Sequence, residues 1–393
     1  MNADTGNAVR ETPLDRARRV GPVIVGQAAA IEAGRALTPD VLDALHGERL
    51  FRCLLPRRFG GEEAHPADHV RMVIELARHD ASTAWCVNQA SGCSMGAAYV
   101  PAATAERVWG RDARAVVASG AGPEGVATVV EGGYRVTGQW LFGSGNRHAT
   151  WMGGHCRVLE PDGSLRRGDD GESMDRTMLF PRAAAKFSDG WDVLGLRGTG
   201  STGYAVTDLF VPDDFAYCRD TDTERQQDAP LYQFTTTHMF AAGFAGVALG
   251  IARGMLDAFV ALARSKTPRG GSQTLRDSTS VQRELALAEG RWRAARAGLL
   301  GTLNETWDAV SGTGLMTPDL SIDIRLASTY AIHEARHVAD IAWREAGATA
   351  IFSAGPFERR LRDIHAVTQQ IQGRMSHMEA VGRHLLGDER VLK

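Results

Sequence analysis

The spacing of apolar residues changes twice along the chain, and this change most constrains the fold. Up to about residue 112 the apolar residues recur at helical spacing, and Gly21-Pro22 predicts a kink in the first helix, which starts at Pro13, or an interruption of it. The next segments are short, β-branched and separated by Gly, Asp and Pro, as is typical of strands. Helical spacing then returns in four long segments, which are residues 234–265, 279–311, 318–352 and 356–387.

This order predicts an α+β fold divided into four parts. Residues 1–12 are expected to be a flexible tail, and residues 13–112 an N-terminal helical domain. Residues 113–225 are expected to form a β-barrel or sandwich, and residues 226–393 a four-helix bundle with short turns. The expected strands are residues 115–119, 127–131, 134–137, 151–158, 177–181 and 204–211.

Charge and cysteine content exclude several classes of function. The formal net charge of −3 gives no general electrostatic reason to bind nucleic acid or an anionic membrane. No signal peptide is expected, and the most apolar run, residues 239–251, is too short to span a bilayer. The five cysteines include no Cys-x-x-Cys pair, which argues against disulfides and structural zinc and favours a reducing cytoplasm. They are Cys53, Cys86, Cys93, Cys156 and Cys218.

Residues 138–151 form the stretch most suggestive of a binding site. A strand carrying Trp140 ends at a Gly-Ser-Gly turn centred on Ser144, directly after Phe142. Glycines on both sides expose the backbone N–H groups and the hydroxyl to a ligand at the sheet edge. Aromatic surface beside fixed polar groups suits a flat heteroaromatic ligand, whereas the alternative is a β-bulge without a ligand.

Two other motifs suggest different chemistry. Residues 333–337 match the His-Glu-x-x-His pattern of zinc peptidases. This pattern lies within a bundle helix, Arg336 adds a cation, and Glu345 or Glu358 would have to supply a third ligand, so a solvated or intersubunit surface is favoured. Residues 198–203 resemble a phosphate-binding loop, but no lysine follows and the next element is a strand, so a tight turn is the alternative.

Four motifs in order carry a family resemblance. They are residues 56–61 (Pro-Arg-Arg-Phe-Gly-Gly), residues 132–145 ending in Gln-Trp-Leu-Phe-Gly-Ser-Gly, residues 195–202 (Gly-Leu-Arg-Gly-Thr-Gly-Ser-Thr) with residues 210–212 (Phe-Val-Pro), and residues 357–365 (Phe-Glu-Arg-Arg-Leu-Arg-Asp-Ile-His). On these motifs the chain resembles flavoproteins of the acyl-CoA dehydrogenase fold. More narrowly, it resembles the oxygenase components of two-component flavin-dependent monooxygenases.

The resemblance implies a flavin site, with FMN or FAD as the cofactor. It places the hydroxyl of Ser144 at the N5/O4 edge of the isoalloxazine, Gly145 as a backbone contact and Phe142 on the ring face. The flavin would also contact residues of the 195–202 segment and a basic residue after the first bundle helix, where Lys266 and Arg269 follow. These further contacts are Arg197, Thr199, Ser201 and Arg264, the last across a subunit boundary. A solvated loop is the alternative for the basic cluster that includes Arg264.

The resemblance also places a substrate pocket next to the flavin. Ser119, at the end of a strand, would line it, and His238 would lie near it. The monooxygenases often present a substrate-orienting histidine from the apolar helix that here spans residues 82–99. This chain instead offers Trp85, Asn88, Gln89 and Cys93. The substrate is therefore expected to differ from a simple phenolate.

The C-terminal helix separates the subfamilies. The dehydrogenases carry a carboxylate base beyond the Arg362-Asp363 pair, but this chain has no acid there before Glu379. A glutamine cannot act as a base, so acyl-CoA dehydrogenation is disfavoured. The monooxygenases usually have a histidine at this place, and here Gln370 replaces it. Either the Gln370 amide or His365, one helical turn away, is the candidate for that role.

These implications predict a monooxygenase. It would use reduced flavin and O2, through a C4a-(hydro)peroxyflavin, to hydroxylate an aromatic or polycyclic small molecule. The alternatives are a dehydrogenase or oxidase acting on a thioester or related substrate, and a flavin-binding protein without catalysis. The chain has no NAD(P)H-binding Rossmann pattern, so a separate NAD(P)H-flavin reductase is expected as partner. The expected assembly is a cytoplasmic homotetramer.

Overall fold

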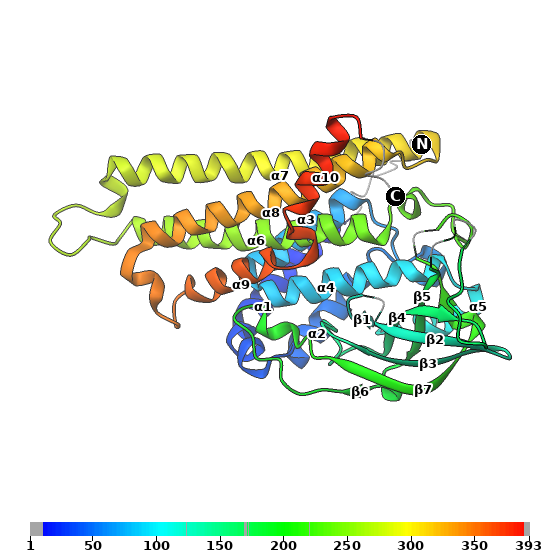
Figure 1. The fold of residues 1–393 in the computed structure, drawn as a ribbon. Coiled ribbons are helices and arrows are strands. Elements are labelled where there is room, and N and C mark those ends of the chain that lie inside the picture. Colours follow the sequence, from blue (N-terminus) through cyan, green and yellow to red (C-terminus); the bar gives the residue numbers. More distant parts are fainter. Residues whose placement is uncertain (1–10, 123, 169–170, 172, 220, 389–393) are drawn as a thin grey trace, which may run out of the picture.

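In the computed structural model, helices precede and follow one connected sheet (Figure 1). The structure describes residues 11–122, 124–168, 171, 173–219 and 221–388. Most of the expected tail, residues 1–12, lies outside these ranges. The element order confirms the predicted α+β architecture, while the division into separate domains stays a prediction.

The N-terminal region consists of helices joined by short turns. They are α1 (Pro13–Gly34), α2 (Pro39–Gly47), α3 (Pro66–His79), α4 (Ala81–Ser94) and α5 (Ala102–Ala105). A capping box of Thr12 and Asp15 starts α1. Of the two alternatives predicted at Gly21-Pro22, the interruption is wrong, because α1 continues through Pro22, while the kink stays a prediction. The helix packs against α3 there so closely that a Cβ on Gly21 would lie 2.6 Å from the His79 ring, and this packing offsets the lost hydrogen bond.

The strands expected as a barrel or sandwich form an eight-stranded sheet in the order β6-β7-β3-β2-β4-β5-β8, with β1 paired in parallel to β4. Strands β2 and β4 are also parallel, whereas β3 pairs antiparallel with β2 and β7. All six expected strands are present, and the two-residue strands β6 and β8 were not predicted. The strands are β1 (Val117–Ser119), β2 (Gly125–Val130), β3 (Gly133–Trp140), β4 (Trp151–Leu159), β5 (Asp175–Pro181), β6 (Lys186–Phe187), β7 (Tyr204–Pro212) and β8 (Ala216–Tyr217).

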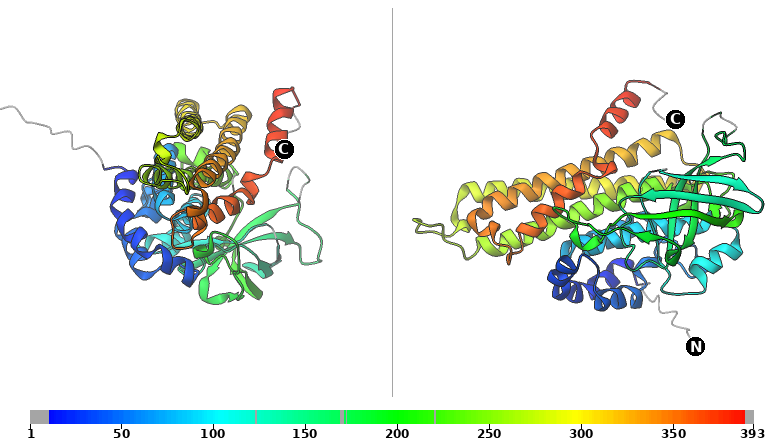
Figure 2. Two further views of the ribbon diagram at one scale, coloured as in Figure 1. Left: turned by 90° about the vertical axis from the view of Figure 1, so that its left-hand side faces the viewer. Right: turned by 60° about the horizontal axis from the view of Figure 1, so that its bottom comes forward.

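The C-terminal region contains three long helices and a broken fourth segment. Helices α6 (Thr236–Ala263), α7 (Thr279–Thr313) and α8 (Pro318–Ala346) run alongside one another (Figure 1). The predicted single helix over 356–387 is wrong, since α9 (Glu358–Thr368) and α10 (Ser376–Leu385) are separate helices. Gln370 leaves the helical conformation with ψ 161°, and its side chain accepts a hydrogen bond from the Gln372 N–H. Consequently α10 projects away from the bundle (Figure 2).

Helix α6 is the buried centre of the bundle and contacts α3, α4, α7, α8 and α9. With 28 residues it is, contrary to the sequence-based expectation, long and apolar enough to cross a membrane, but 67% of its most apolar window is buried inside the protein. Small residues permit the close approach of its neighbours. A Cβ on Gly243 would lie 1.8 Å from Asn88 Oδ1, and one on Gly250 would lie 2.3 Å from the Ile74 carbonyl oxygen.

Replacing Gly243 with alanine should therefore separate α4 from α6. We expect Gly243→Ala to lower the free energy of unfolding by about 1–3 kcal/mol, because a well-packed contact must open to admit the methyl group. The matched control is Gly290→Ala in the exposed surface of α7, where a Cβ meets nothing within 4 Å. This control should be neutral or stabilising by up to about 1 kcal/mol. Equal urea midpoints for both variants would contradict the proposed packing.

Candidate active site

Two turns meet at the edge of the sheet. The first, residues 142–146, follows β3, and the second, residues 195–202, precedes β7. Their backbones are joined by hydrogen bonds from Gly145 N–H to the Thr199 carbonyl (3.1 Å) and from Gly143 N–H to the Thr202 carbonyl (3.3 Å). Gly145 adopts φ 78°, a left-handed conformation that favours glycine. The second glycine of the Gly-Ser-Gly sequence is thus favoured by the turn that presents Ser144.

A chain of buried hydroxyl groups runs between these turns. Ser144 Oγ lies 2.7 Å from Ser201 Oγ, which lies 2.7 Å from Thr199 Oγ1. The indole Nε1–H of Trp85, on α4, donates to Ser144 Oγ at 3.0 Å. The fold therefore brings together residues from separate parts of the chain. Ser144, Thr199 and Ser201 were expected at the flavin, and Trp85 was expected at the substrate.

Aromatic side chains lie beside this hydroxyl chain. Trp85 stacks on Phe244 with ring centroids 4.0 Å apart, and Phe240 stacks on Phe244 at 6.0 Å. Phe142 is 58% exposed and pairs with the Trp191 ring in an edge-to-face arrangement. Aromatic faces next to a buried hydroxyl fit the flat, polar-edged ring of a flavin.

Two further polar groups support this fit. Within the described part of the chain, Arg197 Nε and Gln370 Nε2 are buried without a hydrogen-bond partner. Buried donors of this kind are costly unless a ligand or water satisfies them. Arg197 also lies 3.9 Å from Glu32 and 3.7 Å from Asp192, so part of its charge is already balanced.

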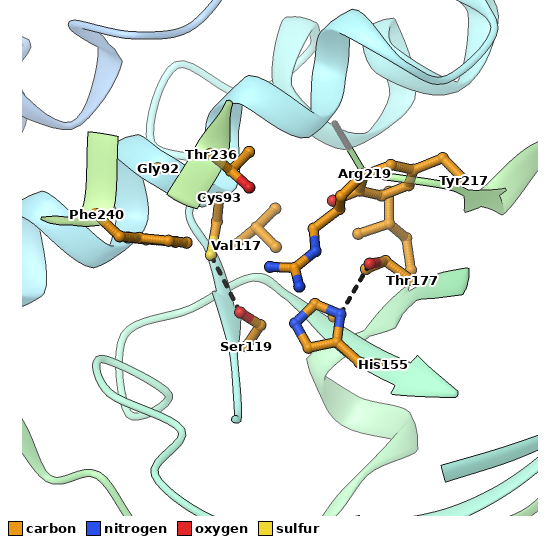
Figure 3. Close-up of a pocket in the computed structure, with 12 residues that line it drawn as sticks. Gly92, Cys93, Val117, Ser119, His155, Thr177, Tyr217, Arg219, Thr236 and Phe240 are labelled. Atoms are coloured by element: carbon orange, nitrogen blue, oxygen red, sulfur yellow. Dashed lines mark hydrogen bonds between the residues drawn. The ribbon is translucent and has the colours of Figure 1, made fainter. Parts of the chain in front are cut away.

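A cavity lies between α4, the sheet and the start of α6 (Figure 3). On one side, Cys93 Sγ lies 3.4 Å from Ser119 Oγ, and the Gln89 amide approaches both groups at 3.8 and 3.5 Å. On the opposite side, His155 Nδ1 lies 2.8 Å from Thr177 Oγ1. Figure 3 shows the Arg219 guanidinium pointing into the space between these two pairs.

Sequence reasoning missed His155, Thr177 and Arg219. The sequence indicates these residues only weakly. His155 stands in a mostly buried strand, and Arg219 follows a strand of two residues that the sequence did not predict. Burial, and to a smaller extent the charge of Arg219, lower the pKa of His155 to about 3, so this imidazole is neutral near pH 7. Arg219 is therefore the cationic side chain of the described cavity lining.

Comparison with known proteins identifies the family. The family model for the acyl-CoA dehydrogenase C-terminal domain matches residues 242–373. The chain is 30% identical over 335 residues to indole-3-acetate monooxygenase of Pseudomonas putida, covering 85% of this chain and 83% of the relative. It is 28% identical over 356 residues to the flavin-dependent monooxygenase oxygenase subunit HsaA of Rhodococcus jostii (strain RHA1), covering 88% and 90%. This protein is an oxygenase component of the two-component flavin-dependent monooxygenases.

A solved structure agrees with this assignment. The crystal structure of 3-HSA hydroxylase from Rhodococcus sp. RHA1 is similar to this oxygenase with a TM-score of 0.87 at 26% identity, covering 96% of this chain and 97% of that chain. The predicted monooxygenase function is confirmed over the dehydrogenase alternative. Other relatives are the FADH2-dependent resorcinol hydroxylase oxygenase component of Rhizobium sp. (strain MTP-10005), 25% identical, and the p-hydroxyphenylacetate 3-hydroxylase oxygenase component of Acinetobacter baumannii, 24% identical.

The structure places three expected site residues elsewhere. Asn88 bonds to His69 Nε2 at 3.0 Å and is buried against α6, outside the cavity lining. His238 Nδ1 accepts a hydrogen bond from the Thr235 N–H, so its side chain caps α6. Arg264 is exposed just after the opposite end of that helix. It lies 20 residues after Phe244, which corresponds to about 30 Å of helix.

The two candidates on the C-terminal segment are in different environments. His365 Nε2 lies 3.0 Å from Asp340 Oδ1 on α8, and its side chain is 41% exposed. Gln370 is half-buried and has an unpartnered amide nitrogen, as described above. Their catalytic roles stay predictions.

The His-Glu-x-x-His motif has other partners. His333 Nε2 lies 2.9 Å from the Gly373 carbonyl oxygen, and His337 Nδ1 lies 3.2 Å from Glu334 Oε1. Glu334 also forms an ion pair with Arg291 at 2.8 Å. The motif therefore joins α8 to α7 and to the segment after α9, which is a structural role.

Asp363 connects the 195–202 turn to α9. Its Oδ1 accepts a hydrogen bond from the Leu196 N–H at 2.6 Å, and Leu196 adopts φ 55° there. Burial raises the pKa of Asp363 to about 7, although the Leu196 N–H acts in the opposite direction. The folded protein thus holds this carboxyl partly protonated near neutral pH.

This shift predicts how pH affects stability. Since the pKa is raised from 3.8 to about 7, the contribution of Asp363 to stability is full below pH 4 and decreases as pH rises toward 7. Asp363→Asn retains an acceptor for Leu196 without the charge. We expect the free energy of unfolding of Asp363→Asn minus that of the unmodified protein to be larger at pH 8 than at pH 5, because only the unmodified protein must bury a charged carboxylate at pH 8. Urea unfolding at both pH values measures this, and Asp363→Ala, which lacks the acceptor, should be destabilised at both.

Proposed function

We propose that this oxygenase hydroxylates an aromatic or heteroaromatic small molecule that carries a carboxylate or a similar anionic group. The observation that carries the proposal is the Arg219 guanidinium, which points into the cavity (Figure 3). Within the described ranges, Arg219 makes no hydrogen bond or ion pair. A substrate anion would give it a partner.

The composition of the cavity supports an anionic ligand. Its described lining contains no Asp or Glu, and the neighbouring imidazole of His155 is neutral for the reason given above. The Asp175 carboxylate is close enough for the charge of Arg219 to lower its pKa, against the larger opposing effect of burial, but the two form no ion pair. A planar guanidinium binds carboxylates through two parallel hydrogen bonds, which also orients the bound molecule.

The names of relatives point to the same substrate class. Two relatives, 30% and 27% identical, are indole-3-acetate monooxygenases of Pseudomonas putida and Acinetobacter baumannii. Another, 24% identical, is a p-hydroxyphenylacetate 3-hydroxylase oxygenase component. Each of these names denotes an aromatic ring with a carboxylate. The name of the FADH2-dependent resorcinol hydroxylase, 25% identical, denotes a ring without one, so the presence of Arg219 is what favours the acidic class here.

The residues of this chain would divide the work as follows. Ser144, Gly145 and Phe142 would hold the flavin edge, while Cys93 and Ser119 would border the substrate ring. When bound, the reduced flavin supplies the electrons that activate O2. Apolar cavity residues exclude water, which protects the reactive site. We propose Gln370, rather than His365, as the donor on the C-terminal segment, because its amide nitrogen is buried and unpartnered whereas His365 is paired with Asp340.

We propose a cytoplasmic homotetramer as the working state. Arg264 lies too far along α6 to serve the site of its own chain, so any flavin contact would be in another copy. Large apolar side chains are exposed on the C-terminal helices and their connections, and a second copy would cover them. They are Leu326, Tyr330, Ile351, Phe352, Ile371, Met375, Leu385 and Leu386. All five cysteines are free thiols, which supports a reducing compartment.

The substrate class is tested by removing the guanidinium. We expect Arg219→Gln to raise the KM for indole-3-acetate by about 10–100-fold, the usual value of a hydrogen-bonded charge, with kcat changed little. The KM for 3-methylindole, which lacks the carboxylate, should change less than about threefold. Turnover is measured with enzymatically reduced flavin as incorporation of 18O from labelled O2 into the product.

Two controls define this experiment. Arg219→Lys keeps the charge but not the paired donors and should give an intermediate KM. Arg111→Gln removes an exposed arginine from the turn after α5 and should change neither KM. The proposal is wrong if Arg219→Gln affects both compounds equally, or if neither compound is oxygenated while other, uncharged aromatics are.

A further inference from the structure

The hydrogen-bond donors in the hydroxyl chain can be assigned, because both of its ends are fixed. At one end, Thr199 Oγ1 lies 2.8 Å from the Leu196 carbonyl oxygen. A carbonyl oxygen only accepts, so the single proton of Thr199 points toward Leu196. Thr199 then has no proton left for Ser201, and the 2.7 Å contact between them requires Ser201 to donate.

The same reasoning fixes Ser144. The proton of Ser201 is used toward Thr199, so the 2.7 Å contact between Ser201 and Ser144 requires Ser144 to donate. An indole N–H only donates, so Ser144 Oγ accepts from Trp85 at 3.0 Å. Ser144 has then used its one proton and one of its two lone pairs. Toward any additional ligand, its hydroxyl can only accept.

Burial makes this order stable. Ser144, Thr199 and Ser201 are exposed by only 6%, 3% and 2%. Reversing the order would place the Thr199 and Leu196 oxygens 2.8 Å apart without a proton between them. Such a buried unsatisfied contact is unfavourable, and little water is available to relieve it.

This polarity distinguishes the redox states of a flavin. Oxidised isoalloxazine has a lone pair at N5, whereas reduced isoalloxazine has an N–H there. A hydroxyl oxygen that can only accept a hydrogen bond can accept one from the N5–H of the reduced ring. Against the oxidised ring, the lone pair of this oxygen would face the lone pair of N5, which is unfavourable.

We propose that Ser201 and Thr199 are positioning residues that orient the Ser144 hydroxyl so that the site selects reduced over oxidised flavin. They act through Ser144 and need not touch the flavin. The inference rests on the proposed function, in which Ser144 lies at the N5 edge. It adds that residues of a different turn determine which redox state this edge accepts.

The test measures binding without turnover. Anaerobic titrations of tryptophan fluorescence would give dissociation constants for oxidised FAD and FMN and for the same flavins reduced with dithionite. In Ser201→Ala the Ser144 proton loses its acceptor and becomes free to point at N5. We expect the ratio of oxidised to reduced dissociation constants to fall by about 5–20-fold, mainly through tighter binding of oxidised flavin.

A second variant keeps both serines. In Thr199→Val the hydroxyl of Ser201 loses its acceptor and can donate to Ser144, which again frees the Ser144 proton. The same direction of change is expected. Ser188→Ala is the matched control. It removes a hydroxyl that donates to the Gly203 carbonyl at 3.2 Å and does not belong to the row of hydrogen-bonded hydroxyls formed by Ser144, Ser201 and Thr199. Its ratio should remain unchanged, and thermal melts would show whether each variant is folded.

Double variants distinguish a wrong placement of Ser144 from a wrong assignment of the residues that orient its hydroxyl. In a Ser144→Ala background, adding Ser201→Ala should leave the ratio unchanged, since the oriented hydroxyl is absent. If Ser144→Ala alters the binding of neither flavin, then the placement of Ser144 in the proposed function is wrong. If Ser144→Ala weakens binding but folded Ser201→Ala and Thr199→Val leave the ratio unchanged, the orientation proposal alone is overturned.

Discussion

Hydrogen bonds between buried polar groups at the junction between the sheet and the helices organise the centre of the molecule. The 195–202 turn is the common partner. It bonds to the Ser144 turn on one side and, through the Leu196 N–H, to Asp363 of α9 on the other. Because the loss of one such partner leaves another group unsatisfied, the sheet, α4 and α9 are held in one arrangement. The site is rigid where the hydroxyl chain lies.

Helix α6 supplies the second constraint. Its glycines let α3 and α4 approach its backbone, and this close packing places Phe244 against Trp85 and Phe240 beside Gly92. The same helix thus shapes both the aromatic surface next to Ser144, formed by Trp85 and Phe244, and one side of the cavity lined by Arg219. An α6 with larger side chains at these positions would move α4 outward and separate Trp85 from Ser144.

The two halves of the site have different chemical demands. Around Ser144, hydroxyl groups and an indole are arranged so that no proton is left free, which suits recognition of a ring edge by its donor pattern. In the adjoining cavity, a neutral histidine and an arginine without a partner among the described residues leave one positive charge, which suits recognition of a substrate by its charge. Redox state and substrate class would therefore be selected by separate residues of one oxygenase.

The sequence by itself determined the α+β order, the six longer strands and the Gly-Ser-Gly turn, because these depend on local spacing and on backbone conformations that glycine permits. It also identified the family through four motifs. It did not determine the continuous α1, the break at Gln370, or the roles of His155 and Arg219. These depend on contacts between residues distant in the sequence, such as α1 with α3 and β4 with β5. Tertiary packing alone decided that Asn88 Oδ1 contacts His69 and that His238 Nδ1 caps α6, because both contacts depend on how the chain folds around these side chains.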